Sequence, residues 1–86
     1  VHALTRAECE ALLARQRVGR LAYVLQGHAN IVPLHYVHAD GWLYGRTGAG
    51  TKLRALRHHP WVAFEVDEVD DHGAWRSVVV RGALYL

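Results

Sequence analysis

The 86-residue sequence contains one cysteine, one lysine, two prolines and no methionine, and it lacks long hydrophobic runs. Its apolar runs fall far short of the roughly 20 residues that cross a bilayer, so we expect no membrane span. A single cysteine excludes a disulfide framework and a cysteine-based zinc site, and without a secretory signal pattern we expect a cytoplasmic protein. The length admits one domain, residues 1–86, and excludes doubly wound nucleotide-binding folds and barrels of about 250 residues.

Hydrophobic residues, by contrast, make up 51% of the chain, which is too many for a disordered protein. A domain of this size buries only about 60–65% of the surface that its unfolded chain exposes. Such a chain has more apolar surface than one small core can bury. We therefore expect either self-association or the ordered part of a longer chain.

The net charge of +2 is unevenly distributed, because five of the eight acidic residues fall between positions 65 and 71. We interpret the acidic segment after residue 67 as a solvated loop. The basic residues are nearly all arginine and are scattered along the chain. They lack the interleaved exposed aromatic residues of a nucleic-acid interface, so we expect no nucleic-acid partner.

The first predicted element is a helix that begins after Thr5 and ends near Arg17. Thr5 and Glu8 have the spacing of a capping box, which satisfies backbone N–H groups at a helix start. An apolar stripe at helical spacing follows, with Cys9 as a small core residue rather than a nucleophile. Gly19 is expected to break the helix.

Beyond Gly19, apolar residues alternate with a period of two, which predicts strands. The predicted strands cover residues 20–25, 31–37, 42–46 and 61–67, and a last one starts at Trp75. Turns are expected after residue 25 and at Asp40-Gly41, and a short helix over 52–58. Pro33 marks a sheet edge, a bulge or a place beside something other than a strand, and Gly82 predicts a bulge or corner. Five antiparallel strands with a leading helix and one short internal helix describe a small barrel.

The segment Gly-Arg-Thr-Gly-Ala-Gly-Thr-Lys at 45–52 contains the groups that bind a phosphate. Its glycines let backbone N–H groups approach an anion, Arg46 and Lys52 supply positive charge, and the segment opens a helix. The order Gly-Thr-Lys at its end differs from a true P-loop, and so short a chain cannot form the parallel sheet behind one, so a nucleoside triphosphatase is rejected. A glycine-rich hairpin exit that binds nothing remains the alternative.

The histidines do not predict a metal site. His35 and His38 lie three apart on a predicted strand and point to opposite faces, while His58 and His59 are adjacent. Ser77 lies inside a predicted strand rather than on a nucleophile elbow, so no catalytic triad is expected. Any chemistry would therefore depend on a bound cofactor.

Several segments together resemble a known family. They are Val-Gly-Arg-Leu-Ala at 18–22, Ile-Val-Pro-Leu-His-Tyr-Val at 31–37, Asp-Gly-Trp-Leu-Tyr at 40–44, Thr-Gly-Ala-Gly-Thr-Lys-Leu at 47–53, His-Pro-Trp-Val-Ala-Phe-Glu-Val-Asp at 59–67, and Trp-Arg-Ser-Val-Val-Val-Arg-Gly at 75–82. In this order they resemble the pyridoxamine 5′-phosphate oxidase-like superfamily of FMN-binding split barrels, and within it the nitroimidazole-resistance branch. The resemblance runs from about Leu12 to the last residue. It implies a mainly β, antiparallel split β-barrel and an FMN-dependent oxidoreductase of unknown substrate, which forms a homodimer with the flavin between the subunits.

The resemblance also implies roles for particular residues. The strand beside the isoalloxazine ring would be formed by Val32, Pro33, Leu34, His35 and Tyr36. The 5′-phosphate would be held by Arg46, Thr47 and Lys52. Trp75 and Ser77 would lie near the site, with the partner subunit as an alternative source of these two side chains.

Two departures from the family pattern limit what is carried over. Many nitroimidazole-resistance relatives have a histidine where this chain has Arg46, so the chemistry of that histidine is not transferred. Longer relatives continue past the position of Leu86, so we expect this chain to lack C-terminal elements and not to oxidise pyridoxamine phosphate. Two alternatives remain: a binding module for haem, with His35 as axial ligand, or another cofactor, and a cofactor-less dimerisation or sensing domain.

Overall fold

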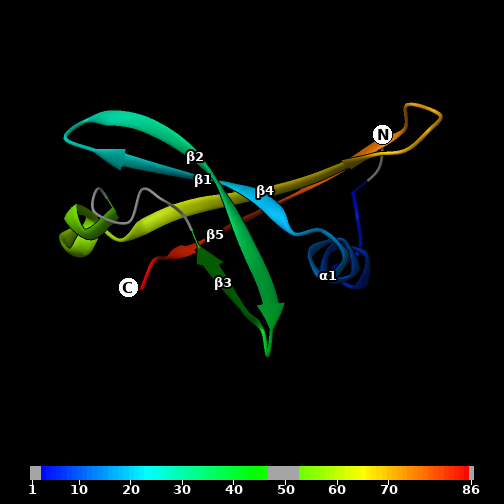
Figure 1. The fold of residues 1–86 in the computed structure, drawn as a ribbon, viewed down its shortest axis with the longest axis horizontal. Coiled ribbons are helices and arrows are strands. Elements are labelled where there is room, and N and C mark those ends of the chain that lie inside the picture. The colour runs from blue at the N-terminus through cyan, green and yellow to red at the C-terminus, as the bar shows by residue number, and fades with distance from the viewer. Residues whose placement is uncertain (1–2, 47–52, 86) are drawn as a thin grey trace.

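The computed structural model of the protein describes residues 3–46 and 53–85 (Figure 1). Its elements, in chain order, are α1 (Arg6–Arg15), β1 (Val18–Leu25), β2 (His28–Ala39), β3 (Trp42–Arg46), the 3₁₀ helix η1 (Arg54–His58), β4 (Trp61–Val69) and β5 (Trp75–Ala83). The strands form one five-stranded antiparallel sheet in the order β3-β2-β1-β4-β5. The fold class predicted from the sequence, mainly β with a leading helix and one short internal helix, is confirmed. None of the helices in the described residues is long and apolar enough to span a membrane.

The start of α1 is the predicted capping box. The Thr5 hydroxyl accepts the backbone N–H of Glu8 at 3.1 Å, and the Glu8 carboxylate accepts the backbone N–H of Thr5 at 2.9 Å. The helix ends at Arg15, two residues earlier than expected, because the backbone is extended from Gln16 onward and enters β1 at Val18. Gly19 therefore lies inside β1 and does not end the helix, which corrects the sequence-based interpretation.

Two tight turns connect the first three strands. Gln26 and Gly27 have φ values of 52° and 78°, and Asp40 and Gly41 have 54° and 78°. Positive φ at both central residues is the geometry of a type I′ turn, whose twist matches that of the flanking strands. These turns extend both hairpins beyond the predicted limits, and β2 reaches 12 residues.

Pro33 lies in β2 without interrupting it, since the register with β1 runs unbroken from Val18↔His35 to Leu25↔His28. The N–H of Tyr36 donates to the Arg17 carbonyl on the β1 side. Because N–H directions alternate along a strand, the Pro33 nitrogen faces the opposite edge, where no ladder bond is lost. The edge interpretation of Pro33 is therefore confirmed and the bulge is not.

Gly82 pairs with Val62 in an equally unbroken register between β4 and β5. The expected bulge at Gly82 is wrong. The strand ends one residue later, at Ala83.

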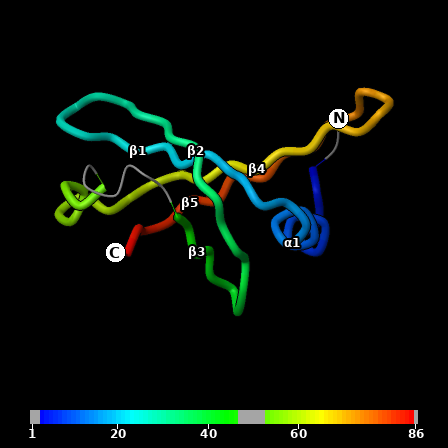
Figure 2. The backbone as a smooth tube through the Cα atoms, in the orientation of Figure 1, coloured from blue at the N-terminus to red at the C-terminus, as the bar shows by residue number. Residues whose placement is uncertain are grey.

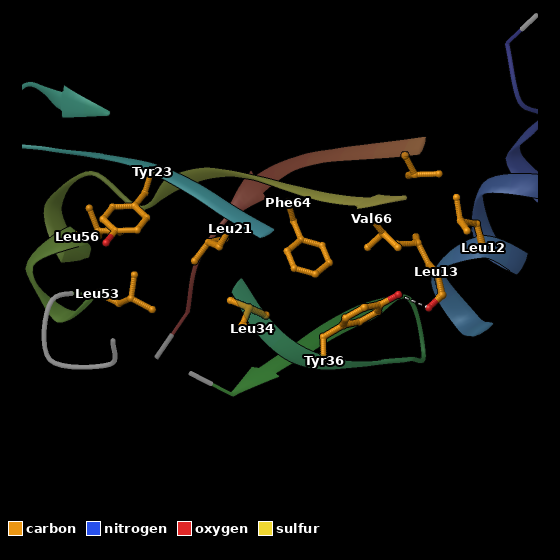
Figure 3. Close-up of a cluster of buried hydrophobic side chains, with 11 residues drawn as sticks. Leu12, Leu13, Leu21, Tyr23, Leu34, Tyr36, Leu53, Leu56, Phe64 and Val66 are labelled. Atoms are coloured by element: carbon orange, nitrogen blue, oxygen red, sulfur yellow. Dashed lines mark hydrogen bonds between the residues drawn. The ribbon is translucent and has the colours of Figure 1, made fainter. Parts of the chain in front are cut away.

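The hydrophobic core fills one side of the sheet between α1 and η1, which lie at its opposite ends (Figures 1 and 3). Leu12 and Leu13 enter it from α1, and Leu53 and Leu56 enter it at the other end, beside Tyr23 (Figure 3). All four leucines are buried, with at most 7% of each side chain exposed. The sheet curls so that the stretch after β5 lies beside β3, where the ring centroids of Trp42 and Tyr85 are 5.9 Å apart (Figure 2).

A charged cluster attaches α1 to the sheet. The Glu68 carboxylate accepts hydrogen bonds from Arg15 at 2.6 and 2.7 Å, from Arg76 at 2.6 Å and from the Gln16 side chain at 2.8 Å. The hydrogen bonds from Arg15, then those from Arg76 and Gln16, lower the pKa of Glu68 to about 2. Glu68 belongs to β4, which runs to Val69, and not to the acidic loop predicted from the sequence.

Candidate functional site

The five residues expected beside a flavin ring divide between the two faces of β2. Leu34 and Tyr36 are buried in the core and Val32 is half-buried, whereas Pro33 and His35 are exposed on the outward face. The Tyr36 hydroxyl donates to the Leu13 carbonyl at 2.6 Å, and burial raises the pKa of this phenol. The side chains of Leu34 and Tyr36 thus belong to the core and are not available to a ligand on the outward face.

The strand β2 has an open edge over its first half. β3 pairs with β2 only from Ala39↔Trp42 to His35↔Arg46. Before His35, no strand of the described residues lies on that side of β2. Since hydrogen-bonding directions alternate, the open edge presents the N–H and carbonyl of Ile31 and the carbonyl of Pro33. A planar ligand with both donors and acceptors on one rim can bind such an edge.

At the end of this open edge, β3 places a cation beside a histidine. His35 and Arg46 are direct cross-strand partners, and both are exposed. Thr47 and Lys52, the other residues expected to hold a phosphate, lie outside the described residues. The chain is described again from Leu53, whose side chain is only 3% exposed in the core.

Trp75 and Ser77 lie on the other edge strand, β5. They pair with Val69 and Asp67 of β4, and Trp75 is 67% exposed. Val78, which follows Ser77 in the same strand, is buried, so alternation places the side chains of Trp75 and Ser77 on the outward face, as for His35. Within one chain, β1 and β4 separate them from the open edge of β2.

An arginine–carboxylate cluster on the same outward face was not predicted from the sequence. Arg20 lies 3.5 Å from Glu65 and 3.6 Å from Asp67, each measured from Nη1 to a carboxylate oxygen. Desolvation first, and then the hydrogen bond and charge of Asp67, raise the pKa of Glu65. The period-two spacing of the two acids within a strand was the available signal, but only the β1–β4 register supplies Arg20 as their partner.

A groove of about 500 Å³ lies among β1, β2, β4 and β5, and its lining combines outward residues such as Ala22 and Trp61 with the buried Tyr23. Its lining is Ala22, Tyr23, Val24, Ala29, Asn30, Trp61, Val62, Ala63, Arg81 and Gly82. Within residues 3–46 and 53–85, no three His, Cys, Asp or Glu side chains gather as a metal-ligand set.

The chain has the architecture of a split barrel. Its antiparallel sheet is curled and preceded by a helix, the second strand has an open edge, and a glycine-rich segment follows the third strand. The sequence profile described as pyridoxamine 5′-phosphate oxidase matches residues 5–86. The chain therefore belongs to the pyridoxamine 5′-phosphate oxidase family, which confirms the resemblance at the level of the superfamily. Its place in the nitroimidazole-resistance branch stays a prediction.

Two solved structures are similar to this chain in fold and in sequence, and one further relative is similar in sequence. The FAD-binding protein from Mesorhizobium loti has a TM-score of 0.83 and 40% identity, over 93% of this chain and 58% of its own. The FAD-binding protein from Mycobacterium smegmatis has a TM-score of 0.78 and 32% identity, over 93% of this chain and 73% of its own. An uncharacterized protein of Rhizobium meliloti (strain 1021) is 33% identical over 82 residues, which are 95% of this chain and 54% of that protein. This chain thus spans little more than half the length of the Rhizobium and Mesorhizobium proteins.

Proposed function

We propose that the protein binds a flavin, FMN, between the subunits of a homodimer, as the cofactor of an oxidoreductase. The observation that carries the proposal is the open edge of β2, which ends at Arg46 beside the glycine-rich segment. Membership of the pyridoxamine 5′-phosphate oxidase family and similarity to two FAD-binding proteins support it. Bound flavin would supply hydride or electron transfer, which the side chains of the described residues cannot carry out by themselves.

The residues present fit such a cofactor in two respects. The rim of the flavin pyrimidine ring alternates hydrogen-bond donors and acceptors, which the backbone of Ile31 and Pro33 can match at the open edge. The phosphate requires cations and backbone N–H groups, and Arg46, Thr47 and Lys52 would provide them. Both FMN and FAD contain the riboflavin 5′-phosphate unit, so this arrangement is compatible with the FAD-binding relatives.

The positions of Trp75 and Ser77 support the proposed dimer. Trp75 and Ser77 are on the opposite edge strand from the open edge of β2. A second subunit would supply them to the first subunit's flavin, and the exposed His35 would then lie at the subunit boundary. No described observation favours haem over flavin at His35.

The test is a titration of the purified chain with FMN, followed by quenching of flavin fluorescence and by thermal shift. Lys52→Ala should weaken FMN binding by at least about tenfold, because a charged phosphate contact contributes about 1.5–3 kcal/mol. Arg6→Ala, which removes an exposed arginine of α1, is the matched control and should bind FMN like the wild type. Absence of binding at micromolar FMN after reconstitution refutes the proposal. If the chain binds FAD but not FMN, the cofactor is FAD and the FMN assignment is wrong.

A further inference from the structure

The charged side chains of the protein are distributed unevenly along its long axis. η1 lies at one end of this axis, and α1 and the hairpin between β4 and β5 lie at the other (Figure 1). The eight acidic residues lie in α1, in the turn between β2 and β3, in the later part of β4 and in the hairpin after it. They are Glu8, Glu10, Asp40, Glu65, Asp67, Glu68, Asp70 and Asp71. None of them belongs to η1 or to the adjoining start of β4.

The two arginines of η1, Arg54 and Arg57, are exposed and have no ion pair within residues 3–46 and 53–85. Arg15, Arg20 and Arg76, by contrast, are each paired with a carboxylate of β4. The charges of the η1 arginines are therefore not neutralised by described side chains. Uncompensated charges of one sign at one end of a protein produce a potential that attracts ions of the opposite sign.

The geometry of η1 places both arginines on one face of the helix. Side chains three residues apart in a 3₁₀ helix lie one above the other, about 6 Å apart along the axis. Leu53, which precedes η1, and Leu56 have the same spacing and are 3% and 2% exposed, so they fix the opposing side of the helix in the core. The face with Arg54 and Arg57 therefore points to solvent. Two like charges at this spacing repel each other, and an approaching anion is attracted by both.

The position of η1 in the chain indicates which anion these charges act on. η1 follows the glycine-rich segment closely, and Arg46 at the end of β3 precedes that segment. Under the proposed function, the ligand that approaches this part of the chain is FMN. A phosphate monoester carries a charge of about −1.5 to −2 at pH 7. A potential of opposite sign around a binding site raises association rates of charged ligands by about 10-fold to 10³-fold.

We propose that Arg54 and Arg57 of η1 steer FMN toward its site through their charge, and so raise its association rate constant without contacting it in the complex. This inference rests on the proposed function and adds a kinetic role for two side chains outside the proposed flavin contacts. Steering requires the charge of these side chains and not their hydrogen-bonding geometry. It also weakens with salt, because the Debye length falls from about 30 Å at 0.01 M to about 3 Å at 1 M ionic strength.

The test measures association and dissociation of FMN separately, by stopped-flow quenching of flavin fluorescence at about 0.01 M and about 1 M KCl. The double variant Arg54→Glu/Arg57→Glu should lower the association rate constant by at least about tenfold at low salt and by less than about twofold at high salt. Its dissociation rate constant should equal that of the wild type. Arg54→Lys/Arg57→Lys, which keeps the charge and removes the planar guanidinium, should associate like the wild type. The matched control Arg6→Glu/Arg17→Glu changes the net charge equally at two exposed positions near α1 and should leave the association rate constant within about twofold of the wild type.

An unchanged association rate constant in Arg54→Glu/Arg57→Glu at low salt overturns the proposal. An equal loss in the control also overturns it, because net charge and not the η1 end would then be responsible. Faster dissociation in the lysine variant shows direct contact with FMN and overturns steering. Circular dichroism checks that each variant folds, and if the double glutamate variant does not, Arg54→Gln/Arg57→Gln replaces it with an expected loss of at least about threefold at low salt. A wild type that does not bind FMN refutes the proposed function and this inference with it, whereas FMN binding with unsteered kinetics refutes only this inference.

Discussion

Replacement of Gly19 by alanine should destabilise the protein more than any other glycine-to-alanine change in the described strands. A Cβ atom at Gly19 would lie 2.2 Å from Cζ of Phe64, 2.7 Å from its Cε1 and 2.9 Å from the carbonyl oxygen of Glu65. The phenyl ring is buried and contacts Tyr36 edge-on, with centroids 5.1 Å apart. The ring therefore cannot move away without disturbing a second aromatic side chain.

The size of the stability loss depends on which of the clashing atoms can move away from the new Cβ atom. Overpacking a core typically costs about 1–3 kcal/mol. Because one of the clashing atoms at Gly19 is a backbone oxygen of the adjacent strand, we expect the upper end, about 3 kcal/mol of unfolding free energy. At Gly45 the nearest atom is the flexible Leu34 Cδ1 at 2.7 Å, so Gly45→Ala should cost about 1 kcal/mol.

Gly82→Ala is the matched control. A Cβ there meets no atom within 4 Å, and alanine restricts the unfolded chain more than glycine does, so this variant should be unchanged or more stable by up to about 1 kcal/mol. The assay is urea unfolding followed by tryptophan fluorescence, at one protein concentration, because any dimer makes stability concentration-dependent. Adding Phe64→Leu to Gly19→Ala should recover part of the loss. A Gly19→Ala stability within about 0.5 kcal/mol of the Gly82→Ala value would show that the packing argument is wrong.

Two further outcomes are expected. Glu68→Gln should reduce the loss of stability on acidification, because a carboxylate whose pKa is lowered from 4.5 to about 2 stabilises the fold above pH 4.5 and loses this effect as the pH falls toward 2. Urea midpoints at pH 7 and pH 3 measure the change, with Glu10→Gln as the control, and a Glu68→Gln variant with the pH dependence of the wild type would contradict the prediction. Tyr36→Phe should lower the free energy of unfolding by about 1–3 kcal/mol, because it leaves the Leu13 carbonyl without its donor. Tyr44→Phe, which removes the hydroxyl of an exposed ring, should leave the free energy of unfolding unchanged in the same urea denaturation. Equal losses in the two variants would argue against the buried hydrogen bond.

Local chemistry made much of the fold predictable. The capping box at Thr5 and the turn at Asp40-Gly41 depend on residues a few positions apart, and both were found where expected. Gly82 was misjudged because a glycine tolerates a bulge without requiring one, and only the register with Val62 shows that none is present. Glu68 was placed in a loop because its stabilising partners, Arg15 and Arg76, come from α1 and β5.

The candidate site was predictable only in part. Resemblance to the family pointed to the stretch from Val32 to Tyr36 and to Arg46, and the structure shows that His35 and Arg46 are neighbours. Which side chains of β2 face outward depends on the strand register, which sends Leu34 and Tyr36 into the core. The Arg20 cluster with Glu65 and Asp67 joins residues about 45 positions apart, which no local pattern reveals.

The sequence by itself determined the elements, their alternation and the surplus of apolar residues, because these depend on backbone propensities and on composition. Tertiary structure alone decided where that surplus lies. Pairing in the order β3-β2-β1-β4-β5 with α1 and η1 on one side gives one sheet face a core and leaves the other exposed. A period-two pattern states that alternate residues share a face, but only the packing of the helices determines which face is buried within the chain.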